Sequence, residues 1–202
     1  MNNTWCQLKE YSIRLVSDIP QSVYECTASV ICLGLIVFIV WKGWRKGLCY
    51  LAALMLISYV FLLFCSTVFY RATGIERKYD FTPFWSYSRP ELMVENIMNV
   101  VVFVPVGILS GLVIQGARFS RLASSNERQG RGMVRHGWLI ALVIGLCISG
   151  SIETIQYFFH RGFAETDDVM HNTLGCIMGY ILVKGSRLMV HGLTKKKNYG
   201  DI

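Results

Sequence analysis

Four polar side chains interrupt an otherwise apolar segment of the chain, and they are Ser149, Glu153, Gln156 and His160. Their successive spacings of 4, 3 and 4 residues place them on one face of a helix. A carboxyl group in such a place can donate or accept a proton, or bind a hard cation. Because an ionisable group inside a bilayer costs at least about 2.5–3.5 kcal/mol, this polar stripe predicts a bundle interior or a water-filled cavity.

The segment that follows carries a second polar face, made of Asp168, Asn172, Gly175 and Gly179. Glu153 and Asp168 have the residue types of an acid–base pair, and with Asn172 they supply the oxygen donors that hard cations prefer. Asp167 stands at the expected start of a helix, where free backbone N–H groups and the helix dipole favour a carboxylate. We therefore expect Asp167 to be structural.

A third polar group opens another apolar segment. Glu95 and Asn99 lie four residues apart on one side of the expected helix, and Asn96 is a near neighbour of Asn99. Asparagine in a membrane span serves either as a contact between helices or as a functional group, and both roles stay open here. Further along, Pro105 cannot donate a hydrogen bond to the carbonyl of Val101, so we expect it to kink the helix or free that carbonyl.

Two pairs of glycines predict close packing between helices. Gly107 and Gly111 form one GxxxG pair, and Gly175 and Gly179 form another. Small residues at this spacing let two helix backbones approach each other within a membrane. We therefore interpret these four glycines as packing residues.

The composition indicates which kind of protein must position these groups. Apolar residues make up 53% of the 202 residues and charged residues only 16%, whereas soluble domains carry about 25% charge. Segments of about 20 apolar residues span a bilayer. The sequence predicts five such spans, over residues 23–41, 48–70, 96–117, 137–159 and 169–190. The predicted fold is an all-α integral membrane helical bundle, with residues 1–202 forming a single multi-pass domain.

The charge of the chain predicts its orientation. The formal net charge is +7, which we assign to membrane topology and not to nucleic-acid binding. With five spans, one side of the membrane holds 13 Lys and Arg residues and the other side holds 7. The positive-inside rule then places residues 42–47, residues 116–136 and the C-terminus in the cytoplasm. Residues 70–95 and 160–168 face outward.

This topology brings the three polar groups to the same side of the membrane. We therefore predict an outward-facing polar pocket, whose candidate residues are Glu95, Asn96, Asn99, Glu153, Gln156, Arg161, Asp168 and Asn172. Arg71 and Arg161 are the candidate counter-charges. The seven cysteines form no CxxC pair and no Cys/His cluster with zinc spacing, so we expect no metal site and no cofactor.

Four ordered blocks of sequence resemble the VanZ-like family of bacterial membrane proteins. They are DFTPF at 80–84, an N-x-x-N segment followed by FVPVG at 96–107, IExxQ followed by Arg161, and DDxxxNTLGxxxG at 167–179. The resemblance covers about residues 70–183. The first block departs from the family pattern, because Asp80 stands where the family has Asn and Thr82 where it has an aliphatic residue.

The resemblance implies a multi-pass protein of the bacterial plasma membrane that is associated with tolerance of glycopeptide antibiotics such as teicoplanin. It carries no catalytic residues over to this chain. The partners it suggests are the lipid bilayer and either a lipid-linked cell-wall precursor or the glycopeptide itself.

Three functional hypotheses remain open. The protein is a non-enzymatic envelope protein that binds a cell-wall ligand or lowers glycopeptide access, an enzyme acting on a lipid or cell-wall precursor with Glu153 and Asp168, or a scaffold whose polar stripes hold the bundle together. The chain lacks HExxH and GxSxG motifs, so the sequence favours a non-enzymatic protein. Transport is less favoured, because the chain has no inverted repeat.

Overall fold

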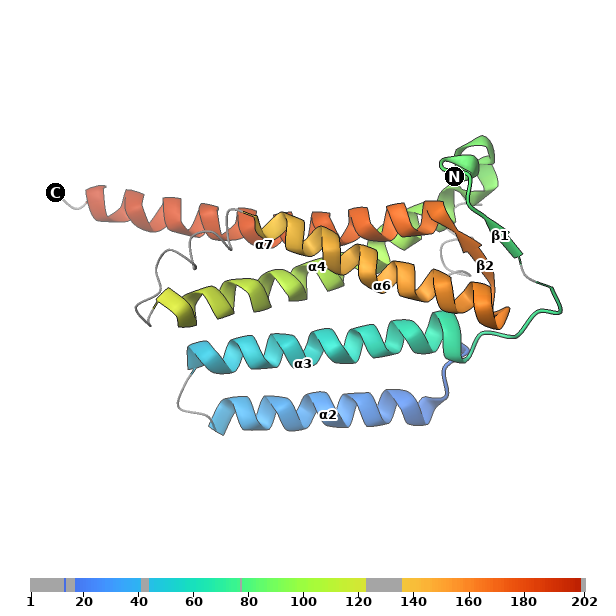
Figure 1. The fold of residues 1–202 in the computed structure, drawn as a ribbon. Coiled ribbons are helices and arrows are strands. Elements are labelled where there is room, and N and C mark those ends of the chain that lie inside the picture. The colour runs from blue at the N-terminus through green and yellow to red at the C-terminus, as the bar shows by residue number, and fades with distance from the viewer. Residues whose placement is uncertain (1–12, 14–16, 41–43, 77, 123–135, 201–202) are drawn as a thin grey trace.

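The computed structural model describes residues 13, 17–40, 44–76, 78–122 and 136–200. Over these residues it forms a bundle of five α-helices, as the sequence predicts (Figure 1). The helices are α2 (Gln21–Val40), α3 (Trp44–Phe64), α4 (Met93–Leu122), α6 (Gly137–Phe159) and α7 (Thr166–Gly200). The all-α membrane bundle is therefore confirmed.

Four helical segments of the described chain are long and apolar enough to cross a membrane, and they are Gln21–Phe38, Gly47–Phe69, Pro90–Ala117 and Gly137–Phe159. The fifth predicted span, 169–190, lies within α7, which is not among them. His171, Asn172 and Thr173 are polar residues in this helix, and all three are buried where α7 packs mainly against α4 and α6.

The glycine pairs lie where α4 and α7 cross. A Cβ atom on Gly107 would lie 2.0 Å from the carbonyl oxygen of Cys176. A Cβ atom on Gly175 would lie 2.1 Å from the carbonyl oxygen of Val100, and one on Gly179 would lie 2.1 Å from that of Val104. Backbone thus meets backbone along this crossing, and only glycine leaves the space.

The centre of the bundle is an apolar core, and its fully buried members include Val106, Ala141 and Cys176. Large apolar side chains also cover the outside, for example Leu33 and Ile57. An apolar surface of this kind is what a lipid environment requires. α4 runs continuously through Pro105, and the Tyr59 hydroxyl donates to the carbonyl of Val102 at 2.8 Å.

One end of the bundle carries the short elements. A π-helix (Cys65–Phe69) ends α3, and the loop to α4 holds strand β1 (Lys78–Asp80) and two 3-10 turns, η2 (Trp85–Ser88) and η3 (Pro90–Leu92). Strand β2 (Phe163–Glu165) joins α6 to α7 and pairs with β1 in parallel. The register places Asp80 opposite Glu165.

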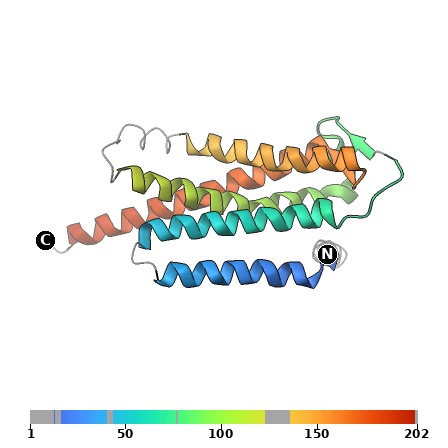
Figure 2. The same cartoon turned by 60° about the horizontal axis from the view of Figure 1, so that its bottom comes forward.

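The arrangement of the helix ends agrees with the topology argument. Figures 1 and 2 show the start of α4, the end of α6 and the start of α7 at the end of the bundle that carries β1 and β2. The end of α2, the start of α3, the end of α4, the start of α6 and the end of α7 lie at the opposite end. Residues 41–43, 123–135 and 201–202, which belong to the predicted cytoplasmic parts, lie outside the described residues. Which end faces outward stays a prediction.

Candidate functional site

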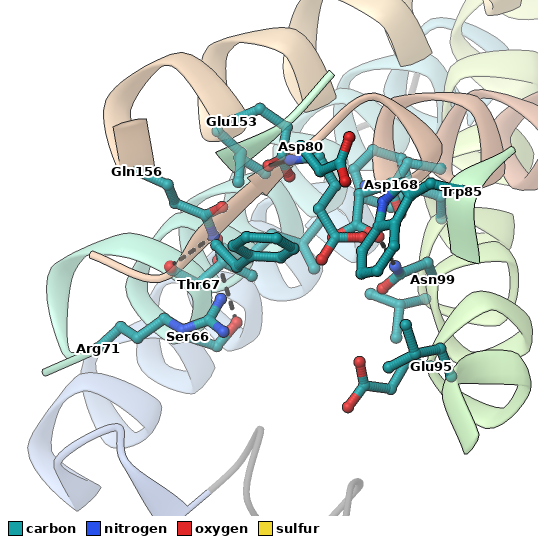
Figure 3. Close-up of a pocket in the computed structure, with 18 of the residues that line it drawn as sticks. Ser66, Thr67, Arg71, Asp80, Trp85, Glu95, Asn99, Glu153, Gln156 and Asp168 are labelled. Atoms are coloured by element: carbon teal, nitrogen blue, oxygen red, sulfur yellow. Dashed lines mark hydrogen bonds between the residues drawn. The ribbon is translucent and has the colours of Figure 1, made fainter. Parts of the chain in front are cut away.

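A cavity of about 500 Å³ opens at the end of the bundle that carries the two strands. Helices α4, α6 and α7, the π-helix that ends α3, and both loops contribute residues to its walls. Six carboxyl side chains line it, and they are Asp18, Asp80, Glu95, Glu153, Glu165 and Asp168. Figure 3 shows Glu153 and Gln156 on one side of the cavity and Glu95 and Asn99 on the other.

The structure brings together most of the predicted pocket residues. Those that line the cavity are Glu95, Asn99, Glu153, Gln156, Asp168 and Asn172, together with the predicted counter-charge Arg71. Asn96 and Arg161 do not line it. The cavity therefore unites groups from α4, α6 and α7 that lie up to 77 residues apart in sequence, from Glu95 to Asn172.

Two carboxyl groups that line the cavity accept direct hydrogen bonds from neighbouring elements. The Asn99 side-chain amide on α4 donates to Oδ1 of Asp168 on α7 at 2.7 Å. The backbone N–H of Glu165 donates to Oε2 of Glu153 on α6 at 3.0 Å. Glu153 is 7% exposed, so strand β2 positions a carboxyl group that has little access to water.

Two buried amides complete the polar wall. The Gln156 amide nitrogen donates to the carbonyl of Thr67 at 3.0 Å, and the Asn172 amide nitrogen lies 2.8 Å from the hydroxyl oxygen of Ser149. Within the described structure, Gln156 Oε1 and Asn172 Oδ1 have no hydrogen-bonding partner. Buried polar atoms are normally paired, so these two enclosed oxygen atoms, on residues that line the cavity, are exceptions to that rule.

Asn96 and Arg161 do not line the cavity but bind backbone or side-chain groups next to it. The Arg161 guanidinium donates to the carbonyls of Val68, Phe69 and Arg71, where the π-helix ends. It thereby satisfies carbonyls that a helix end leaves unpaired, and it is not a counter-charge inside the cavity. The Asn96 amide donates to the hydroxyl of Ser86 at 3.0 Å.

Asp167 anchors the loop that precedes α4. Its buried carboxylate accepts hydrogen bonds from the backbone N–H of Phe84 at 2.6 Å and of Ser86 at 3.0 Å, and from the Ser86 hydroxyl at 2.6 Å. Phe84 adopts a left-handed backbone conformation with φ of 64°. Asp167 is thus structural, although its partners lie in the loop at 84–86 and not in its own helix.

A comparison with known families then identifies the chain's relatives. A family model described as VanZ/LLP1 matches residues 48–189, which is most of the chain. The chain belongs to the VanZ-like family. No curated protein and no solved structure gives a match. The family match begins within α3, so α2 lies outside it.

Sequence reasoning missed several residues of the VanZ-like cavity. Glu165, Trp85 and Arg89 lie on short elements between helices, where no helical spacing reveals which way a side chain points. Burial and the neighbouring carboxyl groups of Asp168, Glu95 and Asp167 raise the pKa of Glu165 to about 8. The Arg89 guanidinium lies over the ring of Trp85, 4.9 Å from its centroid.

The chemistry available to the VanZ-like site follows from these groups. No group of three or more His, Cys, Asp and Glu side chains in the described part of the chain could hold a metal ion. Glu153 and Asp168 each bind a different partner, on β2 and α4 respectively. The site is therefore an acidic cavity rich in hydrogen-bond acceptors, with two arginines, Arg71 and Arg89, in its wall.

Proposed function

We propose that this VanZ-like protein binds a cell-wall or lipid-linked ligand in the polar cavity, at the outer surface of the bacterial plasma membrane. Binding there lowers the access of teicoplanin-type glycopeptides to their target. The observation that supports this proposal is convergence: the blocks that resemble the family place Asn99, Glu153 and Asp168 around one cavity of about 500 Å³. Cavities of roughly 300–1,000 Å³ are typical of small-ligand sites.

The experiment is a susceptibility panel in a host that lacks the protein. It compares the wild type with Glu153→Gln and Asp168→Asn, each at the same membrane level. We expect both variants to lose most of the protection against teicoplanin, because each removes an ionisable carboxyl group from the cavity wall while keeping the side-chain shape. Unchanged protection in both variants would remove the cavity from the mechanism.

Glu91→Gln is the matched control for this panel. Glu91 lies in η3 on the same loop as the cavity residue Arg89, is exposed, and does not line the cavity. The control variant should keep wild-type protection. The scaffold hypothesis is tested in parallel by thermal unfolding, since it requires Glu153→Gln to lower the amount or stability of the protein before it lowers protection.

The enzyme hypothesis keeps one observation in its favour, which is that Glu153, Glu165 and Asp168 line one cavity. Two carboxyl groups in different surroundings can serve as acid and base. Purified protein that turns over a lipid-linked cell-wall precursor, and loses turnover in Glu153→Gln, would favour this function over simple binding.

A further inference from the structure

We propose that the cavity binds an ammonium group, a primary amine in its charged form carried by the ligand. This inference rests on the proposed function, because it names the chemistry of the ligand for the same cavity. Three features support it. They are the excess of acidic side chains in the cavity wall, the unpaired hydrogen-bond acceptors, and the three N–H donors that an ammonium group would bring.

Acidic side chains outnumber basic ones in the cavity wall. Six carboxyl side chains line it against two guanidinium groups, those of Arg71 and Arg89. Both arginines are exposed and Glu153 is buried, and the charge of Arg71 acts on both Glu153 and Asp168. Burial first, and then the neighbouring carboxyl groups, raise the pKa of Glu165 to about 8, so this group is mostly protonated near pH 7. A cation that enters would relieve this repulsion.

The unpaired acceptors require a hydrogen-bond donor. Gln156 is 3% exposed, and its amide nitrogen is fixed because the Thr67 carbonyl can only accept. Its Oε1 atom is therefore the free acceptor, and no described group donates to it. Figure 3 shows this side chain reaching toward Thr67 in the cavity wall. Asn172, on the neighbouring α7, also has one unpaired amide atom, but its partner is the Ser149 hydroxyl, which can either donate or accept.

An ammonium group fits these features better than other ligand classes. A metal ion needs several oxygen ligands at about 2.0–2.6 Å around one point, and no described cluster of side chains offers that. An anion would be repelled by the carboxyl groups. An ammonium is a compact charge with three N–H donors, which suits a wall lined by carboxyl groups. The rings of Trp85 and Phe163 add aromatic wall.

Two sources can present this chemistry at a membrane surface: the ethanolamine head group of a phospholipid, and a water-soluble amine. The experiment titrates full-length protein in a neutral detergent with short-chain phosphatidylethanolamine, with its N-acetylated derivative, and with free ethanolamine, and follows binding by calorimetry. The N-acetylated lipid keeps the phosphate and the acyl chains but has no cation.

The expected result is that the lipid amine binds at least about tenfold more tightly than its N-acetylated form, as loss of a charge-assisted hydrogen bond predicts. Binding of free ethanolamine with no binding of the lipid would assign the ammonium to a soluble ligand. Equal binding of both lipids, or no binding of either amine, would overturn the proposal.

Variants tie the binding to this cavity. Asp168→Asn removes a charge but keeps an oxygen that can accept from Asn99, and should weaken amine binding roughly tenfold. Glu95→Gln changes an exposed carboxyl group of the cavity wall, and should weaken binding by up to about fivefold. Glu91→Gln should bind as the wild type does. Wild-type affinity in both cavity variants would contradict the proposal.

The two proposals can fail separately. If protection against teicoplanin depends on Glu153 and Asp168 but the protein does not distinguish amines from N-acetylated lipids, the ammonium inference is wrong and the functional cavity stands. If amines bind in the cavity and protection does not depend on it, the role in glycopeptide tolerance is wrong.

Discussion

Two cavities of similar size lie in different parts of the bundle, and their walls have opposite chemistry. The cavity between α2 and α3 has about 440 Å³ and is lined by apolar and aromatic side chains such as Leu33 and Leu51. The cavity at the strand end has about 500 Å³ and is lined by six carboxyl groups. Lipid chains can fill the first without any specific contact, whereas the second offers polar and ionisable groups that apolar chains cannot satisfy.

The helices around the two cavities also differ in how deeply they are buried. Only 6% of the α2 span Gln21–Phe38 is buried, against 33% of the α4 span Pro90–Ala117. The family match covers most of α3, all of α4 and α6, and α7 up to residue 189, and it leaves α2 out. The comparison indicates that α4, α6 and α7 form the packed body of the bundle, and that α2 lies at its periphery.

The largest contrast is expected between two glycines, one in each region. A Cβ on Gly175 would lie 2.1 Å from the backbone carbonyl of Val100, and a Cβ on Gly34 would lie 2.2 Å from the side-chain tip of Leu54. A backbone cannot move aside as a leucine tip can. Thermal unfolding in detergent should show Gly175→Ala destabilised by about 1–3 kcal/mol and Gly34→Ala by less than about 1 kcal/mol. Equal losses would show that the two regions are packed alike.

The next largest effect on stability is expected from Asp167, which holds the loop between β1 and α4. Asp167→Ala leaves the N–H groups of Phe84 and Ser86 without their acceptor, which costs about 1–3 kcal/mol for a buried group. We expect a lower unfolding temperature and faster proteolysis within the loop that joins β1 to α4. The exposed Glu91, changed to Ala, should alter neither readout. A loop that stays resistant in Asp167→Ala would mean that the anchor does not hold it.

An effect of pH is also expected. The pKa of Glu165 is raised to about 8 by burial and by carboxyl groups on the elements around it, Asp168 and Asp167 on α7 and Glu95 on α4. The folded state therefore holds this proton longer than the unfolded chain, whose glutamate pKa is about 4.3. Stability should fall as pH rises from about 4.5 to 8, and this fall should be shallower in Glu165→Gln. Unfolding temperatures across pH 5–9 measure it, and identical slopes in both proteins would contradict the cause given.

The smallest effect is expected on the lipid-facing surface of α2. Leu33 is 63% exposed, so Leu33→Ala removes an apolar surface that lipid covers and the protein core does not. We expect a stability change within about 0.5 kcal/mol and unchanged protection against teicoplanin. A marked loss of protection at equal membrane level would show that the apolar cavity contributes to function.

Helical spacing explains why much of the site could be predicted from the sequence. Glu153 and Gln156 on α6, and Asp168 and Asn172 on α7, occur at helical intervals in segments where polar residues are costly. The fold class could be predicted from the excess of apolar residues, because segments of about 20 apolar residues span a bilayer as helices.

The rest of the site depends on contacts between distant segments. Trp85 and Glu165 reach the cavity from a 3-10 turn and a short strand, and the parallel pairing of β1 with β2 joins residues more than 80 positions apart. Arg161 has the residue type of a counter-charge, but it binds the carbonyls at the end of the π-helix. Such contacts depend on tertiary placement, which the spacing of residues within one helix does not encode.

The most direct test of the central claim is the teicoplanin susceptibility of cells that carry Asp168→Asn, compared with cells that carry Glu91→Gln at the same membrane level. If the acidic cavity is the functional site, Asp168→Asn loses most of the protection and Glu91→Gln keeps all of it. If both variants protect as the wild type does, the cavity is not the site through which this VanZ-like protein acts.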